Sequence, residues 1–339
     1  MGRGPTKNYH KNMNEFYVAG SLTCLKPRVI EKKITTDFPL VLNIEPTNDC
    51  NLRCCFCPRD KVAERYGIHY IDWSLYKSLI DQADVQAQRY GKLIMLNLHK
   101  DGEPLLHPKL PDMVRYAKER EIFHTIHLNT NGMLLGSEQG KELLKSGIDD
   151  ITISVDAARA ETFARFKGVD ALAKLEKNIQ QFYRWRDELG AKTFIRVKIM
   201  EFDDIEKEEV EEFISKWEPI ADEVQVTGVH SWSGAIDKLN ITDEQSSERY
   251  PCALLWYMLA VNADGKVSVC NVDWDRSGVI GDAHMMALKD IWNNSQMKQI
   301  RHNQLKQCWH KPAVCESCVI WVSIGDMKEY FLKRKDFWK

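Results

Sequence analysis

Short apolar runs alternate with longer amphipathic segments over the first two thirds of the 339-residue chain. The apolar runs, rich in Ile, Val and Leu, predict buried strands at residues 40–45, 92–98, 123–129, 150–155, 193–199 and 223–228. The segments between them have helical spacing and predict helices at residues 73–89, 109–120, 137–146, 159–188 and 205–217. Alternating strands and helices build βαβ units with right-handed crossovers around a parallel sheet. We therefore predict an α/β fold whose six strands curl into a barrel or partial barrel.

The pattern changes after about residue 235. Residues 256–270 form two β-like runs around Asp264-Gly265, a pair of residues that strongly favours a hairpin turn. A helix is predicted next, at residues 287–303. Residues 1–39 are polar and carry seven Lys or Arg against three Asp or Glu, which indicates a solvated arm or a cap. We accordingly expect three parts, which are the arm at 1–39, the barrel at 40–235 and a smaller domain at 236–339.

Composition narrows the class of protein. The net charge of −2 gives no overall attraction to nucleic acid, and no run of about 18 apolar residues predicts a membrane span. The first residues lack the apolar core of a signal peptide, so we expect a cytoplasmic protein with neither a nucleic-acid nor a membrane partner. Ten cysteines in such a chain favour metal binding over disulfides.

Three closely spaced cysteines follow the first predicted strand. Cys50, Cys54 and Cys57 have the spacing C-x3-C-x2-C, with Phe56 just before the third. Three thiolates can hold three irons of a 4Fe–4S cluster and leave the fourth iron open to a small molecule. A loop at a strand end is also where a β/α barrel keeps its chemistry. On spacing alone, a structural zinc site is the alternative.

This spacing resembles the signature of the radical S-adenosylmethionine (radical SAM) superfamily. The resemblance implies a (β/α)6 partial TIM barrel, and it implies that the open iron chelates the amino and carboxylate groups of SAM. An electron from the cluster would then cleave SAM to a 5′-deoxyadenosyl radical, which takes hydrogen from a substrate. A reductant such as flavodoxin or ferredoxin is expected as the electron donor. The resemblance also places Phe56 beside the adenine.

Other strand ends supply candidate SAM contacts. Gly102 and Glu103 resemble the family's GGE motif, with Asp101 in place of the first glycine, and Glu103 is expected to hold the SAM ammonium. The other candidates that the resemblance suggests are Asn131, in the sequence Thr-Asn-Gly, and the pair Ser154 and Asp156 for the ribose hydroxyls. Arg196 and Lys198 share one face of the strand at 193–199, so a cation there could neutralise the SAM carboxylate. Ordinary strand-end turns and a solvated strand face remain alternatives for these positions.

A second cysteine set lies in the last third of the chain. Its members are Cys252, Cys270, Cys315 and Cys318. They resemble the SPASM/twitch auxiliary-cluster domain, which implies a second 4Fe–4S cluster, with zinc as the alternative. Cys308 is left over as a core thiol, an alternative ligand or a hydrogen-atom donor to a substrate radical.

Together these features predict an enzyme that oxidises an alcohol to a ketone, or epimerises it, on a polar small molecule of the sugar or aminocyclitol type. Candidate bases or substrate contacts at the barrel mouth are Lys100, Asp101, Lys198, His230 and Asp273. A peptide maturase that forms crosslinks is one alternative. Only 49 residues precede Cys50, fewer than the leader-binding domain of such maturases, which favours a small substrate. A metal-binding protein without catalysis is the other alternative.

Overall fold

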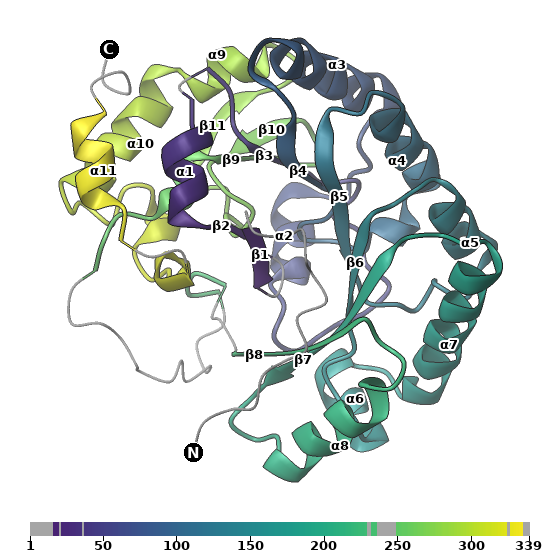
Figure 1. Cartoon of the computed structure of the whole chain (residues 1–339). Coiled ribbons are helices and arrows are strands. Elements are labelled where there is room, and N and C mark those ends of the chain that lie inside the picture. Colours follow the sequence, from purple (N-terminus) through teal and green to yellow (C-terminus); the bar gives the residue numbers. More distant parts are fainter. Residues whose placement is uncertain are drawn as a thin grey trace.

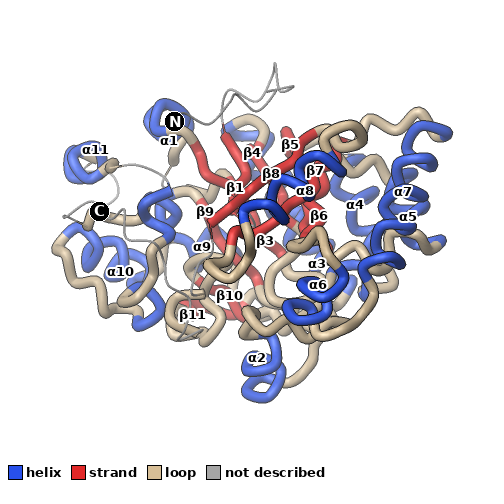
Figure 2. Tube along the Cα trace, turned by 90° about the horizontal axis from the view of Figure 1, so that it is seen from below, coloured by secondary structure: helices blue, strands red, loops and turns tan. Residues whose placement is uncertain are grey.

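The computed structural model describes residues 16–19, 22–35, 37–228, 232–235, 249–323 and 326–334, with the side chains of 16–24 and 323 left aside. One nine-stranded sheet dominates it, in the order β11-β10-β9-β3-β4-β5-β6-β7-β8 (Figure 1). Seen at right angles to that view, the strands occupy the centre and the helices lie around them (Figure 2).

Six parallel strands form the partial barrel. They are β3 (Val41–Ile44), β4 (Leu93–Asn97), β5 (Phe123–Thr130), β6 (Asp150–Ser154), β7 (Phe194–Glu201) and β8 (Glu223–Gly228). All residues of β3 and β4 are buried, as expected for parallel strands covered on both faces. The predicted six-stranded α/β barrel is therefore confirmed.

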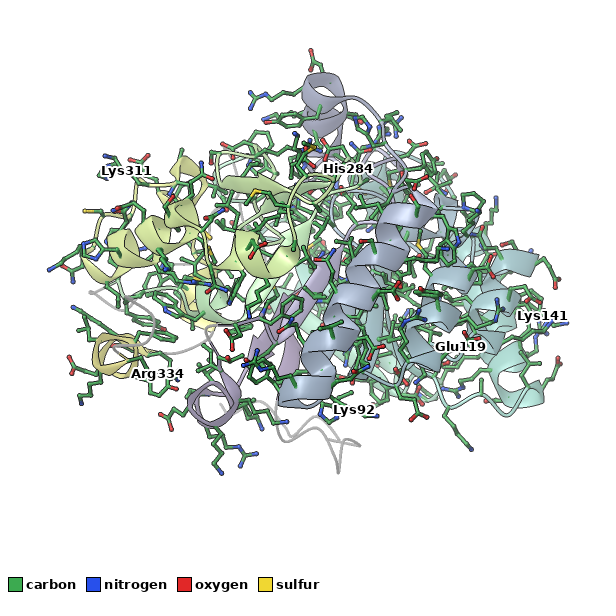
Figure 3. All side chains as sticks on the ribbon, turned by 90° about the horizontal axis from the view of Figure 1, so that it is seen from above. Lys92, Glu119, Lys141, His284, Lys311 and Arg334 are labelled. Carbon is green, nitrogen blue, oxygen red and sulfur yellow. The ribbon has the colours of Figure 1, made fainter. Side chains whose placement is uncertain are left out.

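Helices cover the outer face of this barrel (Figure 1). They are α3 (Trp73–Tyr90), α4 (Leu110–Glu119), α5 (Glu138–Lys145), α6 (Ala160–Lys167), α7 (Leu172–Glu188) and α8 (Lys207–Trp217). Charged side chains project outward from them, among them Glu119 and Lys141 (Figure 3). Within the described ranges, no helix has both the length and the apolar content that a membrane span requires.

The single helix predicted at 159–188 is wrong, because the chain breaks into α6 and α7 at Gly168. This glycine has φ of +74°, a left-handed conformation that ends a helix and that other residues rarely adopt. A Cβ at this position would lie 2.8 Å from the carbonyl oxygen of Arg53. The break therefore lets the end of α6 approach the loop that carries the first cysteines.

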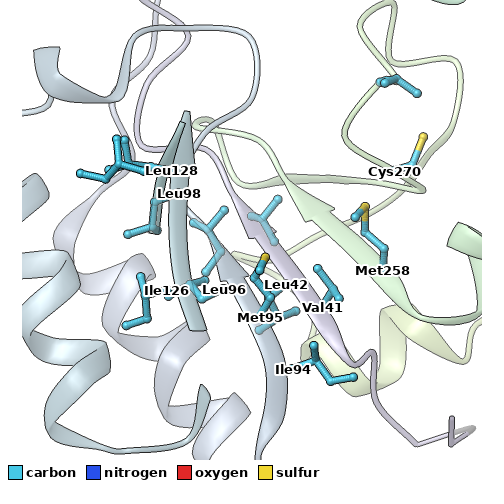
Figure 4. Packing of buried hydrophobic residues seen from close by; sticks show 14 of the residues in the cluster. Val41, Leu42, Ile94, Met95, Leu96, Leu98, Ile126, Leu128, Met258 and Cys270 are labelled. Carbon is cyan, nitrogen blue, oxygen red and sulfur yellow. The ribbon is translucent and has the colours of Figure 1, made fainter. Parts of the chain in front are cut away.

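The predicted hairpin is confirmed and extends the barrel sheet. Strands β9 (Met258–Val261) and β10 (Lys266–Ser268) are antiparallel around Gly265, and β11 (Val279–Asp282) pairs with β10. Strand β9 also pairs in parallel with β3, so the last third of the chain continues the barrel's own sheet. Apolar packing follows this continuity, because Val41 and Leu42 on β3 belong to one core cluster with Met258 and Cys270 (Figure 4).

Further short elements surround this sheet. The single helix predicted at 287–303 is wrong, because the chain forms α9 (Leu288–Trp292) and then α10 (Ser295–Leu305), whose first turn is capped by the side chain of Asn294. The others are β1 (Phe16–Ala19), β2 (Leu22–Leu25), α1 (Pro27–Lys33), α2 (Arg59–Tyr66), α11 (Lys328–Lys333) and the 3-10 helices η1 (Pro104–Leu106), η2 (Ala253–Trp256), η3 (Ala313–Cys315) and η4 (Ile320–Ser323). Helix α1 contacts helix α11, since the Tyr330 hydroxyl donates to the Glu31 carbonyl at 3.1 Å.

Candidate active site

The loop between β3 and α2 carries Cys50, Cys54 and Cys57. Its backbone is tied to α6, since the amide of Cys55 donates to the carbonyl of Phe166 at 3.0 Å. The loop's other side is held by the buried guanidinium of Arg59, which binds the carboxylate of Asp49 at 2.6 Å. The three thiols are thereby presented at the carboxyl end of the barrel strands.

A cavity of about 370 Å³ opens above these strands. All three thiols of the loop line it. So do nine further residues predicted from the sequence, which are Phe56, Lys100, Asp101, Gly102, Glu103, Asn131, Ser154, Asp156 and Lys198. Arg196, Asp273 and Cys308 are not among the described residues that line it. His230 lies outside the described residues.

Glu103 is held rigidly at the cavity wall. Its carboxylate accepts hydrogen bonds from the Thr130 hydroxyl at 2.7 Å, the Asn131 amide at 2.7 Å and the Leu105 amide at 3.1 Å. Burial of the side chain outweighs these bonds and raises the pKa of Glu103 to about 7. A carboxylate so placed can accept an ammonium group, which would compensate for its burial.

Gly102 allows the Glu103 loop and the cysteine loop to touch. A Cβ at Gly102 would lie 2.2 Å from the carbonyl oxygen of Thr47 and 2.5 Å from that of Asp49. The two loops are joined at this point, since the amide of Glu103 donates to the Asp49 carbonyl at 2.7 Å. Only glycine fits this approach, so the motif position is explained by geometry.

Asp156 organises two lysines at the opposite wall. It has φ of +60°, an uncommon conformation for a residue with a side chain. Lys167 donates to its Oδ2 at 2.6 Å, and the ammonium of Lys198 lies 3.9 Å from its Oδ1. Burial alone would raise the pKa of Asp156, but the two lysines hold it below its usual value.

Lys167 was not predicted from the sequence, because it lies within the segment predicted as one long helix. It is the last residue of α6, and its ammonium also donates to the Ser154 carbonyl at 3.0 Å. The ammonium lies 5.2 Å from the ring centroid of Phe56, so a cation stands next to the cysteine loop. The glycine that follows it, Gly168, was the available signal for a helix end at this point.

Phe56 packs beneath the cavity. Its ring centroid lies 5.0 Å from that of Phe202 and 6.2 Å from that of Phe166, and the residue is buried. Across the cavity, the Asn131 amide group reaches the Cys50 sulfur at 3.8 Å and the Asn51 side chain at 2.7 Å. Aromatic and amide contacts thus frame the thiols from two sides.

Arg196 lies deeper in the barrel than the cavity. Its guanidinium binds the carboxylates of Glu223 at 2.8 Å and Asp150 at 3.1 Å, and the Thr152 hydroxyl at 2.9 Å. These partners belong to β6 and β8, so Arg196 ties three neighbouring strands together. Lys198, two residues farther along the same face of β7, is the cation that lines the cavity.

Lys100, Asp101 and Asp273 link the barrel to the last third of the chain. The ammonium of Lys100 forms a fully buried ion pair with Asp101 and also approaches the backbone carbonyl of Asp273 at 3.3 Å. The carboxylate of Glu45 accepts from the amides of Asp101 and Ala263, each at 2.9 Å. Burial raises the pKa of Asp273 to about 6. These groups form a buried polar contact between β3, β4 and the segment after β10.

The second cysteine set also converges. Cys252, Cys270, Cys315 and Cys318 together line a gap of about 20 Å³. Burial is the main reason why the pKa values of Cys270 and Cys315 are raised. Arg249 lines the same gap. The leftover Cys308 lies just after α10, with its sulfur 3.8 Å from the Lys306 carbonyl, and lines neither of these two spaces.

The donors in both sets suit iron–sulfur clusters. In the described part of the chain, no three Cys, His, Asp or Glu side chains meet at one point as they would around a single ion. A 4Fe–4S cluster instead binds each thiolate at a different corner, so its ligands surround a shared space. The first set has three thiols and an open side, which leaves one iron for a small molecule. The second has four thiols, enough to ligate every iron.

Residues 44–215 match the radical SAM superfamily. The chain belongs to this superfamily. Residues 252–319 match the SPASM iron–sulfur cluster-binding domain, which includes all four cysteines of the second set. The chain is therefore a radical SAM enzyme with a SPASM domain.

Curated relatives match over part of the chain. A cofactor-modifying protein for tungsten-containing aldehyde ferredoxin oxidoreductase from Pyrococcus furiosus is 32% identical over 150 residues, 44% of this chain and 40% of that protein. The PqqA peptide cyclase of Granulibacter bethesdensis is 30% identical over 136 residues, 40% of this chain and 34% of that protein. The chain thus spans less than half the length of these relatives.

Solved structures share the fold over more of the chain. BtrN in complex with AdoMet and 2-DOIA has a TM-score of 0.56 at 19% identity, covering 83% of this chain and 93% of BtrN. Streptococcus suis SuiB bound to the precursor peptide SuiA has a TM-score of 0.62 at 16% identity, covering 90% of this chain and 75% of SuiB. At these identities the likeness establishes the partial barrel and its C-terminal extension.

Proposed function

We propose that this enzyme oxidises an alcohol carbon of a polar small molecule to a ketone, and that it carries two 4Fe–4S clusters. When bound at the first cysteine set, SAM and a reduced cluster supply a 5′-deoxyadenosyl radical that takes one hydrogen atom from the substrate. Cys50, Cys54 and Cys57 would ligate this cluster, and an external reductant such as flavodoxin or ferredoxin would supply its electron. The substrate would occupy the remainder of the 370 Å³ cavity.

The cavity walls suit SAM in its zwitterionic form. Glu103 would accept the methionine ammonium, since its carboxylate faces the cavity and lacks a cationic partner within ion-pair distance among the described residues. Lys167 would bind the methionine carboxylate, because it is the cation beside the cysteine loop. Ser154 and Asp156 line the same wall and would receive the ribose hydroxyls.

The second cysteine set is the observation that favours oxidation over epimerisation. A substrate carbon that has lost a hydrogen atom must still lose one proton and one electron to become a carbonyl carbon. A cluster ligated by Cys252, Cys270, Cys315 and Cys318 would offer no iron to substrate, because four thiolates would occupy all four irons. Such a cluster can accept the electron, and the oxidation is then balanced. Epimerisation needs a hydrogen donor instead, and the candidate Cys308 does not line the cavity.

A peptide maturase is the second candidate. The likeness to SuiB bound to a precursor peptide, and to a PqqA peptide cyclase, favours it. An enclosed second cluster would serve a crosslinking reaction as an electron acceptor as well. The substrate class is therefore what an experiment must decide.

The deciding experiment uses reconstituted enzyme, SAM and a chemical reductant in heavy water, with a panel of sugars, sugar acids, sugar phosphates, aminocyclitols and precursor peptides. Oxidation predicts one SAM consumed for each ketone formed, with the same yield in Cys308→Ala. Solvent deuterium at the product carbon, lost together with turnover in Cys308→Ala, would indicate epimerisation instead. A crosslinked peptide as the product would contradict both, and failure to release 5′-deoxyadenosine on reduction would indicate binding without catalysis.

A further inference from the structure

Lys198 presents a buried ammonium group to the cavity without a close acceptor. The side chain is only 8% exposed and lines the cavity from β7. Its one ion-pair contact among the described residues is Asp156 Oδ1, at 3.9 Å, which is too far for a hydrogen bond. A buried ammonium loses its hydration and is stabilised only when other acceptors replace the water.

Asp156 does not supply a hydrogen-bond acceptor for the Lys198 ammonium. Its Oδ2 accepts from Lys167 at 2.6 Å, and its Oδ1 accepts from the Met200 amide at 3.1 Å. The Asp156 carboxylate therefore lies near both lysines, but it contacts Lys167 more closely than Lys198. Asp156 thus leaves the Lys198 ammonium without a carboxylate at hydrogen-bond distance.

No other carboxylate of the described cavity lining lies within ion-pair distance of Lys198, and Cys54 acts on it only over a longer range. Lys100 and Asp101 neutralise each other in their buried pair. Glu103 lies among Thr130 and Asn131 on the β4–β5 side, whereas Lys198 lies on β7. The lining near Lys198 continues with Met200 and with Thr227 and Gly228 at the end of β8, which carry no charge.

We propose that Lys198 binds an anionic oxygen group of the substrate, a carboxylate or a phosphate. This inference rests on the proposed function, because it assigns Lys167 to the SAM carboxylate and leaves Lys198 for the second molecule in the cavity. The two lysines approach different oxygens of the Asp156 carboxylate, Lys167 the Oδ2 and Lys198 the Oδ1. The substrate is thus an acidic molecule, such as a sugar acid, a sugar phosphate or a peptide with an acidic side chain next to the reacting carbon.

The test measures anion binding to holoenzyme already saturated with SAM, by calorimetry under anaerobic conditions. The probes are inorganic phosphate and acetate, which separate the phosphate source from the carboxylate source. The variants are Lys198→Met, which keeps the length of the side chain without the charge, and Lys198→Arg, which keeps the charge. Lys177→Met, at an exposed position on α7, is the matched control.

We expect one of the two anions to bind saturably, about tenfold more weakly in Lys198→Met and within threefold of the natural protein in Lys198→Arg and Lys177→Met. The affinity for SAM should be equal in all four proteins. No saturable binding to the natural protein, or equal anion binding in Lys198→Met, would overturn the inference. Weakened SAM binding in Lys198→Met would assign the lysine to SAM instead. Release of 5′-deoxyadenosine on reduction tests the proposed function separately, since it needs no acidic substrate.

Discussion

The two cysteine sets have the same ligand chemistry but different access to solvent. Cys50, Cys54 and Cys57 face a cavity of about 370 Å³, whereas the four cysteines of the second set enclose about 20 Å³. A metal centre with an open coordination position can bind and activate a ligand, and a closed one cannot. The number of thiols and the space around them together distinguish a site that can bind SAM from a site suited to electron transfer.

The charged neighbours of the two sets differ as well. The first set faces both signs of charge, from Glu103, Asp156 and Lys167, which suits a ligand that is itself zwitterionic. The second set has Arg249 in its gap, held between the rings of Trp309 and Trp321 at 4.8 and 5.9 Å. Arg249 forms no ion pair with a carboxylate of the described residues, and its Nε is buried without a hydrogen-bond partner there. Its other two nitrogens donate to the backbone carbonyls of Cys315 and Glu316.

The largest effect is expected from removing one set at a time. Cys50, Cys54 and Cys57 changed together to Ala should remove about half the iron and abolish SAM cleavage. Cys315 and Cys318 changed to Ala should also remove about half the iron, but SAM should still bind, because the open site is intact. Iron and sulfide analysis with 5′-deoxyadenosine assays measures both. Zinc in either set, or loss of all iron from the first variant, would contradict the comparison.

Glu103→Ala should weaken SAM binding by roughly 1.5–3 kcal/mol, the usual range for a hydrogen bond to a charged group. Glu103→Gln is the matched control, since it keeps the shape and removes the charge. The measurement is SAM affinity by anaerobic calorimetry with iron content verified. Unchanged affinity with an intact cluster would rule out this role.

A pH dependence of SAM binding should accompany that role. The pKa of Glu103 is raised to about 7 in the ligand-free protein, so the side chain is partly protonated at neutral pH. Only the carboxylate attracts an ammonium, so SAM affinity should rise between pH 6 and pH 8 as the proton is lost. Glu103→Gln should flatten this profile. A natural-protein profile that falls over the same interval would contradict the assignment.

Arg249→Gln should lower the midpoint potential of the second cluster alone. Loss of a positive charge disfavours the more negative, reduced cluster, by about 1 kcal/mol at this partly exposed position, or roughly 40 mV for one electron. Arg249→Lys should retain most of the charge effect. Redox titration followed by electron paramagnetic resonance resolves both clusters, so the first serves as the internal reference. Equal shifts in both would point to a general structural change.

The smallest effect is expected at Cys308. Because its sulfur lines neither space and the residue is only partly buried, Cys308→Ala should change the free energy of unfolding by about 0.5 kcal/mol or less. The iron content should stay that of the natural protein. Loss of iron in this variant would make Cys308 a ligand and would revise the composition of the second set.

Patterns within a few neighbouring residues predicted those strands and turns whose structure is set by neighbouring residues. Strands β3 and β4 are buried on both faces, so each appears as an apolar run, and Asp264-Gly265 marks its own turn. The pairing of β9 with β3 has no such local signal, because it joins segments at opposite ends of the chain. The break at Gly168 had a local signal in the glycine itself, but the close approach of the Arg53 carbonyl to this position is a long-range contact.

Prediction of the candidate site from the sequence has a similar limit. Spacing singled out the three thiols, and the strand end together with the resemblance to the GGE motif singled out Glu103, because these signals lie within a few neighbouring residues. Depth along a strand is harder to predict, so Arg196 and Lys198 could not be ranked until the register of β7 against β6 and β8 was known. Lys167 enters the site only through the turn that ends α6.

The pairing of β3 with β9 bears on how the protein folds while it is being made. Strand β3 leaves the ribosome early, but the strand that covers its outer edge is among the last to emerge. Until Met258–Val261 arrives, the barrel has an unpaired apolar edge, which is the kind of surface that invites aggregation. Folding should consequently be slow and dependent on completion of the chain, as expected for contacts between remote segments. A fragment that stops before residue 258 should therefore aggregate, even though it contains all six parallel strands and the whole first cysteine set.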